Sequence, residues 1–139
     1  MSQDDDLYSE LGFYTLAHRD PAFIHQVAVD AYTAQSANEA TKPIALVFAL
    51  VGLYLYLEKG YTGKQVQQAH MRLANKTKHW PRLPIPAERG EIRIEHVVNA
   101  PPGPDRDALI HRWCASVWRS WHESHPVIAA ISYEYLGTD

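Results

Sequence analysis

The chain has 139 residues, of which 46% are hydrophobic and 21% charged, a composition that excludes wholesale disorder, collagen-like repeats and coiled-coil rods. The formal net charge is -3, and the lone cysteine, Cys114, leaves no intrachain disulfide, which is compatible with a reducing cytosol. The first residues, MSQDDD, lack a basic stretch followed by an apolar one. We therefore expect a cytoplasmic protein with a single domain over residues 1–139.

The charges are unevenly distributed along the chain. Residues 1–41 carry seven acidic side chains and one basic one, whereas residues 59–87 carry six basic side chains and no acidic one. Such a basic stretch suits a phosphate backbone, or the acidic segment of the same or a neighbouring chain. Because the pI of the whole chain is about 6.2, we regard nucleic acid as the less favoured partner.

Two helices are predicted in the first half, after an acidic segment at residues 1–17. Asp20-Pro21 has the residue types of a helix start, and the helix should run to Ser36. A second helix starts at Thr41-Lys42-Pro43 and is apolar on every side from Ile44 to Leu57, so it should be the central helix of the core. It is too short for a membrane span. Gly52 inside it predicts the close approach of a neighbouring helix or a ligand.

Thr62 can cap a third helix that runs to about Lys78, with an inner stripe formed by Val66, Ala69, His70 and Leu73. Residues 80–104 are rich in proline and should form an extended crossover. Within it, residues 91–98 alternate between apolar and polar side chains as in a short strand. No partner strand is evident, however, and we favour a short helix.

A fourth helix begins at Pro104-Asp105 and carries an apolar stripe that reaches Trp121. Ser124, His125 and Pro126 interrupt it, and a terminal helix continues to Leu136. The sequence therefore predicts an all-α fold, a compact bundle of four to five helices around a central apolar helix with a Pro-rich crossover.

Three blocks carry a family resemblance, namely HQVAVDAYTAQ at 25–35, TKPIALVFALVGLYLYLEKGYTGKQVQQAHMRLA at 41–74 and WCASVWRSW at 113–121. Together they resemble a bacterial family known only as a domain of unknown function, over about residues 18–121. The resemblance implies no activity. It implies that relatives often carry histidine where this chain has Val27, Ser36 or Tyr56, so a metal site that depended on those positions would be incomplete here, whereas His18, His25 and His70 are kept.

Histidines and acids on facing helices are the usual donors for metal sites in bundles. His25 lies on the first long helix and His70 on the third, and we predict a polar pocket between them that holds a divalent transition metal or a small-molecule ligand. Asp30, Tyr32 and Glu58 would serve as supporting or catalytic partners in this pocket. Without a metal, His25 could act as an acid or base together with Asp30 and Tyr32. The structural alternative is that both histidines are satisfied by backbone or water.

In that structural alternative for the two histidines, Asp30 pairs with Arg72 or Lys42.

Cys114 lies on an apolar stripe and should be inert, although His111 is close in sequence. A non-catalytic interaction module is a second possible function, in which the aromatic C-terminal region forms a homodimer. Trp118 is off the main stripe and is either an exposed anchor for a partner or a cover for the Pro-rich crossover. The chain contains no P-loop, GxGxxG, paired cysteines, GxSxG or HExxH motif.

Overall fold

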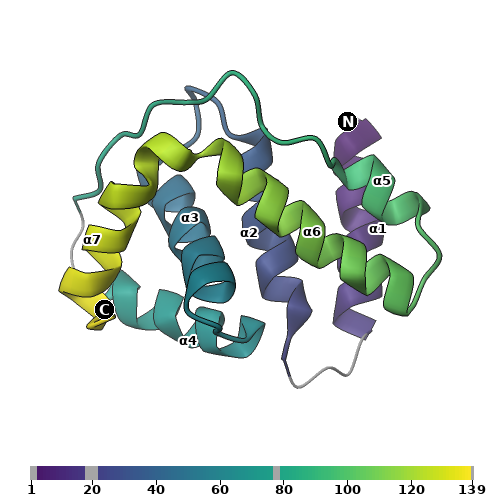
Figure 1. The fold of residues 1–139 in the computed structure, drawn as a ribbon, viewed down its shortest axis with the longest axis horizontal. Coiled ribbons are helices and arrows are strands. Elements are labelled where there is room, and N and C mark those ends of the chain that lie inside the picture. The colour runs from purple at the N-terminus through teal and green to yellow at the C-terminus, as the bar shows by residue number, and fades with distance from the viewer. Residues whose placement is uncertain (1–2, 18–21, 77–78, 139) are drawn as a thin grey trace.

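The computed structural model describes residues 3–17, 22–76 and 79–138, and within them all regular secondary structure is helical (Figure 1). The predicted all-α class is therefore confirmed. The elements in chain order are α1 (Gln3–Ala17), α2 (Ile24–Ser36), α3 (Pro43–Glu58), α4 (Gly63–Ala74), α5 (Ile94–Asn99), α6 (Pro104–Ser120), the short 3-10 helix η1 (His122–Ser124) and α7 (His125–Leu136).

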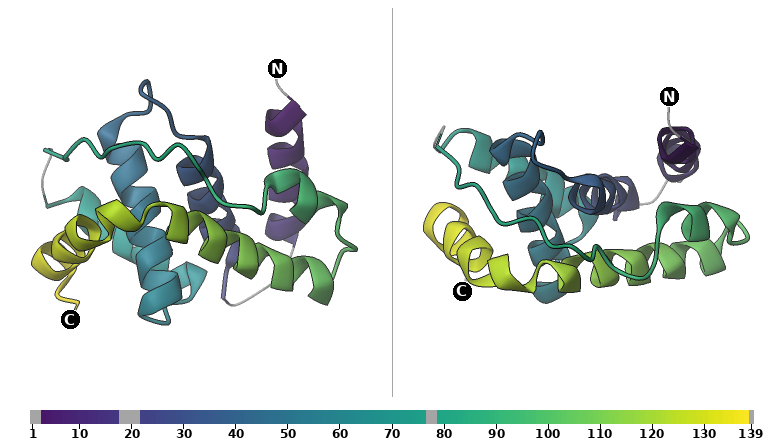
Figure 2. Two further views of the ribbon diagram at one scale, coloured as in Figure 1. Left: turned by 45° about the horizontal axis from the view of Figure 1, so that its top comes forward. Right: turned by 90° about the horizontal axis from the view of Figure 1, so that it is seen from above.

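The apolar helix α3 is the centre of the molecule, as its sequence predicts. It packs against α2, α4, α6 and α7, which surround it in Figures 1 and 2. Its residues from Leu46 to Leu55 are buried with the exception of Phe48, which is half-buried. Because partners lie on every side, this helix needs no polar face.

The first helix of the chain, α1, is not among the predicted elements. Its inner face carries Leu11 and Thr15, but its outer face carries Phe13 and Leu16, so that apolar side chains lie on both sides. The helix stands at one edge of the molecule against α2 and α5 (Figure 1). This lack of one clean apolar stripe removes the periodicity by which an amphipathic helix is recognised.

Helix α2 begins at Ile24, after the predicted start at Asp20-Pro21, two residues that lie outside the described ones. Phe23 precedes the helix in the left-handed region, with φ 55°. A residue with this backbone conformation cannot be part of an α-helix, so the predicted beginning is wrong. The predicted end at Ser36 is confirmed.

Helix α4 shows the predicted cap. The Thr62 hydroxyl accepts a hydrogen bond from the Gln65 backbone N–H, and the Gln65 side chain accepts one from the Thr62 N–H, which makes a reciprocal capping box. The helix ends at Ala74, earlier than the predicted Lys78, which lies outside the described residues.

The side chains of Gln35, Arg89 and Ser116 hold the Pro-rich crossover, the last by accepting a hydrogen bond from the Glu91 N–H at 3.0 Å. The amide of Gln35 donates to the carbonyls of Arg89 and Ile92, at 3.1 and 2.8 Å, and accepts from the Trp113 indole at 3.0 Å. The Arg89 guanidinium donates to the carbonyls of Gln35 and Pro86. The crossover is extended up to α5, which is the short helix favoured over a strand at residues 91–98.

The exposed-anchor prediction for Trp118 is wrong. This indole is 6% exposed, donates to Glu58 at 2.7 Å and stacks on His125 with ring centroids 3.7 Å apart. It thus joins the end of α3 to α7 and belongs to the core, whereas the residue beside the crossover is Trp121. No helix in the described part of the chain is both long and apolar enough to cross a membrane.

Candidate functional site

The most unusual polar group inside the protein is the carboxyl of Asp30 on α2. The residue is 3% exposed, and its Oδ2 atom has no hydrogen-bond partner. Its Oδ1 atom accepts a hydrogen bond from the Gln26 amide at 3.1 Å, one turn earlier on the same helix. Buried polar atoms are nearly always paired, so an unpartnered buried carboxyl oxygen calls for an explanation.

His70 on α4 faces this carboxyl. Its Nε2 atom is 3.8 Å from Asp30 Oδ2 and donates to the carbonyl oxygen of Phe48 on α3 at 2.7 Å. A carbonyl only accepts, so the Nε2 atom carries the proton. The other ring nitrogen, Nδ1, is 3.5 Å from the Gln26 amide nitrogen and is the acceptor of that contact. The Phe48 carbonyl therefore holds the imidazole with a proton on Nε2.

Burial acts on both groups in the direction of neutrality. It raises the pKa of Asp30 well above its usual value, an effect that the Gln26 hydrogen bond opposes. It also lowers the pKa of His70, against the opposing effect of the Phe48 carbonyl. The two groups are close enough to interact, and at each of them the effect of burial is larger than that of the hydrogen bond that favours the charged form.

Gly52 explains how the carboxyl fits between the helices. A Cβ atom at this position of α3 would overlap Asp30 Oδ2 and would lie 3.1 Å from His70 Nε2. The prediction that Gly52 marks a close approach is confirmed, and the group that approaches is the Asp30 side chain. We call Gln26, Asp30, Phe48, Gly52 and His70 the α2–α4 polar cluster.

The structure places the other predicted site residues elsewhere. His25 lies on the side of α2 that faces α1, where its Nδ1 atom is 2.7 Å from the Thr15 hydroxyl. That hydroxyl donates to the Leu11 carbonyl, so His25 Nδ1 donates in turn. Burial lowers the pKa of His25. His25 thus tethers α2 to α1, whereas His70 contacts α3.

Tyr32 also connects α2 with α1. Its hydroxyl donates to Asp5 at 3.0 Å, and its ring stacks on Tyr8 with centroids 4.1 Å apart. Burial and the nearby Asp5 raise its pKa to about 12. Glu58 accepts the Trp118 indole N–H, at the other end of α3 from Phe48. The structure therefore brings together Asp30 and His70, and it gives His25, Tyr32 and Glu58 other partners.

The structure agrees in part with the alternative in which backbone or water satisfies both histidines and Asp30 forms an ion pair. A backbone carbonyl does satisfy His70, but neither Arg72 nor Lys42 pairs with Asp30, because Arg72 reaches the carbonyl of Leu136 on α7. Cys114 is buried and its thiol donates to the Val27 carbonyl at 3.6 Å. Burial raises the pKa of this thiol, which agrees with the predicted lack of reactivity.

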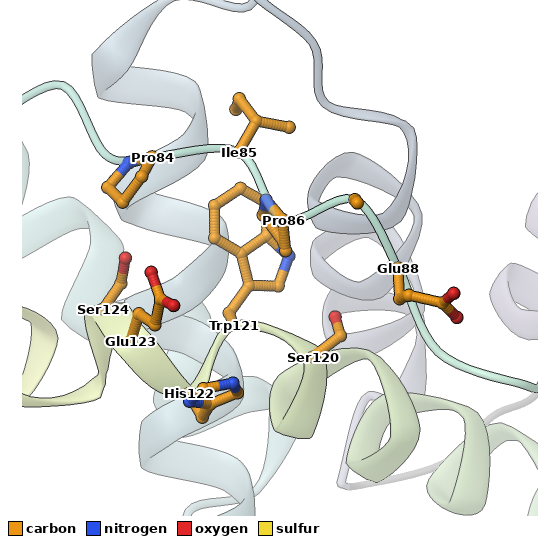
Figure 3. A pocket seen from close by; sticks show the side chains of 10 residues that line it. Pro84, Ile85, Pro86, Glu88, Ser120, Trp121, His122, Glu123 and Ser124 are labelled. Atoms are coloured by element: carbon orange, nitrogen blue, oxygen red, sulfur yellow. The ribbon is translucent and has the colours of Figure 1, made fainter.

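A surface hollow of about 430 Å³ lies between the crossover and the junction of α6 with η1 (Figure 3). The Trp121 indole lines it, with only 1% of the residue exposed, beside Pro84, Ile85 and Pro86. Its titratable lining residues, Glu88, His122 and Glu123, are all exposed. The hollow therefore lacks a buried titratable side chain such as Asp30 in the α2–α4 polar cluster.

Comparison with known proteins gives one match. A family model described as "Family of unknown function (DUF5946)" matches residues 5–122. The chain belongs to this family. No curated protein and no solved structure matches it. The matched range of the DUF5946 chain contains the whole α2–α4 polar cluster and excludes α7.

Proposed function

We propose that this DUF5946 protein binds one divalent transition metal ion between α2 and α4, with Asp30 and His70 as its protein side-chain ligands. The observation that carries the proposal is the buried Asp30 Oδ2 atom, which lacks a hydrogen-bond partner and lies 3.8 Å from His70 Nε2. The proposal keeps His70 as a ligand of the predicted interhelical metal site and replaces His25 by Asp30 as the second ligand.

The distance between the two atoms supports a shared ion. Bonds from a metal such as zinc to imidazole nitrogen and carboxylate oxygen are each about 2.1 Å, so two ligand atoms of one ion are at most about 4.2 Å apart. The Asp30–His70 distance is below this limit. The Phe48 carbonyl, 2.7 Å from His70 Nε2, offers a third oxygen donor on α3.

The charge of the site supports a cation as well. A buried carboxylate is strongly disfavoured unless a positive partner accompanies it, and no lysine or arginine fills that role for Asp30 in the described structure. Burial raises the pKa of Asp30 well above its usual value, so the metal-free site favours the protonated carboxyl. A divalent ion would replace that proton and the one on His70 Nε2, so its affinity should increase with pH.

The described residues contain no group of three or more His, Cys, Asp or Glu side chains that could hold a metal. Two side-chain ligands leave the remaining positions to the Phe48 carbonyl, the Gln26 amide or water. We therefore expect weaker binding than at a closed structural zinc site with four protein ligands.

The test is the metal content of the untagged protein purified without chelator, followed by calorimetric titration of the metal-free protein with Zn²⁺ and Mn²⁺. Asp30→Asn and His70→Gln should each lower the affinity at least tenfold. His25→Gln is the matched control. Like His70, His25 is a half-buried histidine, but it lies on α2 and faces α1. Circular dichroism verifies that each variant is folded.

Two outcomes would overturn the proposal. One is folded wild-type protein that binds neither ion, and the other is binding that survives both Asp30→Asn and His70→Gln. Loss of binding in His25→Gln alone would instead support the site predicted around His25.

The alternative function, a homodimer through the aromatic C-terminal region, loses its main anchor because Trp118 is buried.

A further inference from the structure

Two helices on opposite sides of α2 carry opposite charge. Helix α1 contains four acidic residues and no basic one, whereas α4 contains Lys64 and Arg72 and no acidic residue. Lys59 and Lys76, both exposed, extend the basic stretch at either end of α4. Both helices pack against α2, from different sides, as Figure 1 shows.

The outward faces of these two helices also expose apolar side chains. On α1, Phe13 is 78% exposed and Leu16 is 59% exposed, and on α4, Met71 is 66% exposed. Asp6, Glu10 and Phe13 follow one another at spacings of four and three, so the acidic and apolar side chains of α1 share one face. Lys64 and Met71 are seven residues apart and likewise share the outer face of α4.

We propose that the acidic outer face of α1 in one molecule docks on the basic outer face of α4 in a second copy of the same chain. The charges of the two faces are opposite, and each face offers exposed apolar side chains for the centre of a contact. Within one molecule the two faces lie on different sides of α2 and cannot meet. The contact is therefore head-to-tail, which adds molecules into a ring or a short chain.

A self-complementary pairing of two α1 faces is disfavoured by the same charges. Asp6 and Glu10 would then face their own copies, and like charges across an interface oppose association. The same holds for two α4 faces, which carry Lys64 and are flanked by the exposed Lys59 and Lys76. The opposite-charge pairing is the arrangement in which both faces are neutralised.

The test is sedimentation velocity of the full chain over a range of concentrations at low and moderate salt. The wild type should exceed the single-chain mass of 15.8 kDa as concentration rises, and the added mass should fall with added salt. Phe13→Lys places a positive charge on the α1 face, and Met71→Glu places a negative charge on the α4 face. Each variant alone should remain a monomer.

The mixture of the two variants gives the decisive result. Phe13→Lys keeps a working α4 face and Met71→Glu keeps a working α1 face, so an equimolar mixture should form a dimer of twice the chain mass and nothing larger. Tyr133→Lys, at an exposed aromatic residue of α7 that is 66% exposed, should associate like the wild type. All three positions are exposed, so the substitutions should leave folding intact.

Three results would contradict the proposal. The first is a wild type that stays monomeric at every concentration and salt. The second is a Phe13→Lys or Met71→Glu variant that dimerises by itself, which would indicate a symmetric interface. The third is association that depends on co-purified polynucleotide and disappears after nuclease treatment, because α4 would then be a phosphate-binding surface.

Discussion

Asp30 and Gly52 occupy one space between α2 and α3, since a Cβ atom on Gly52 would overlap Oδ2 of Asp30 and lie 2.8 Å from its Cγ atom. A glycine inside a helix costs roughly 1 kcal/mol relative to alanine. The helix tolerates that cost because the absent side chain makes room for a buried carboxyl next to His70. The identities of these two residues are therefore coupled.

Gly52→Ala should destabilise the protein by about 1–3 kcal/mol, because the added methyl group must displace Asp30 within a tightly packed region. Chemical denaturation followed by circular dichroism measures this change. Gly12→Ala on α1 is the control, since its Cβ atom would meet only His25 Cε1, at 4.0 Å. That variant should gain roughly 0.5–1 kcal/mol from helix propensity.

The double variant Asp30→Ala/Gly52→Ala shows whether steric overlap with Asp30 causes the loss of stability in Gly52→Ala. If the overlap is responsible, the Gly52→Ala substitution should cost much less when Asp30 is already alanine, and the two changes should not be additive. Additive effects would show that Gly52 acts on stability without the Asp30 side chain.

Trp118→Ala should cost about 3–5 kcal/mol of unfolding free energy, as expected for a buried indole. The substitution removes its stacking on His125 and its hydrogen bond to Glu58. Trp118→Phe keeps most of the apolar contact and should cost less. Tyr133→Ala on the exposed surface of α7 should change stability by less than about 0.5 kcal/mol. A Trp118→Ala protein as stable as the wild type would restore the prediction of an exposed anchor.

The sequence was sufficient for the elements whose residues act locally. An uninterrupted apolar run from Ile44 to Leu57 predicts a central helix in any bundle, and Thr62 predicts the start of α4 through a hydrogen bond to its own neighbours. Local patterns were insufficient at Phe23, whose left-handed conformation delays α2, and in α1, whose apolar residues lie on two faces.

The candidate site was predicted only in part, because its geometry depends on three helices. The sequence pointed to His70 on an inner stripe and to Asp30 on the facing helix, and Gly52 signalled a close approach. It could not show that His25 turns toward α1, because the choice between two faces of α2 depends on where Thr15 is placed. The Phe48 carbonyl carries no signal in the sequence, since a backbone acceptor is present at every residue.

Gln35→Ala should destabilise the protein by about 2–4 kcal/mol, because it leaves the buried Trp113 indole N–H and two crossover carbonyls without their partner. Equilibrium unfolding measures the loss, and hydrogen exchange should show faster exchange at residues 86–93. Gln68→Ala, on the exposed side of α4, is the matched control and should be within about 0.5 kcal/mol of the wild type. Unchanged exchange in the crossover would show that Arg89 and Ser116 hold it without Gln35.

Tyr32 should titrate at about 12 instead of the ordinary 10.0, because burial and the hydrogen bond to Asp5 disfavour its charged form. The unfolded chain loses this proton near pH 10 while the folded protein keeps it, so folded stability should decrease as pH rises from 10 to about 12. The difference in tyrosinate absorbance between the wild type and Tyr32→Phe isolates this group from the other tyrosines.

Asp5→Asn tests the cause of that shift. The asparagine carbonyl still accepts the Tyr32 hydrogen bond but carries no charge, so the titration of Tyr32 should move part of the way back toward pH 10, while the stacking on Tyr8 is kept. Burial remains as the larger cause and should hold the pKa above its ordinary value. A titration that does not move at all in Asp5→Asn would mean that the charge of Asp5 does not contribute to the raised pKa of Tyr32.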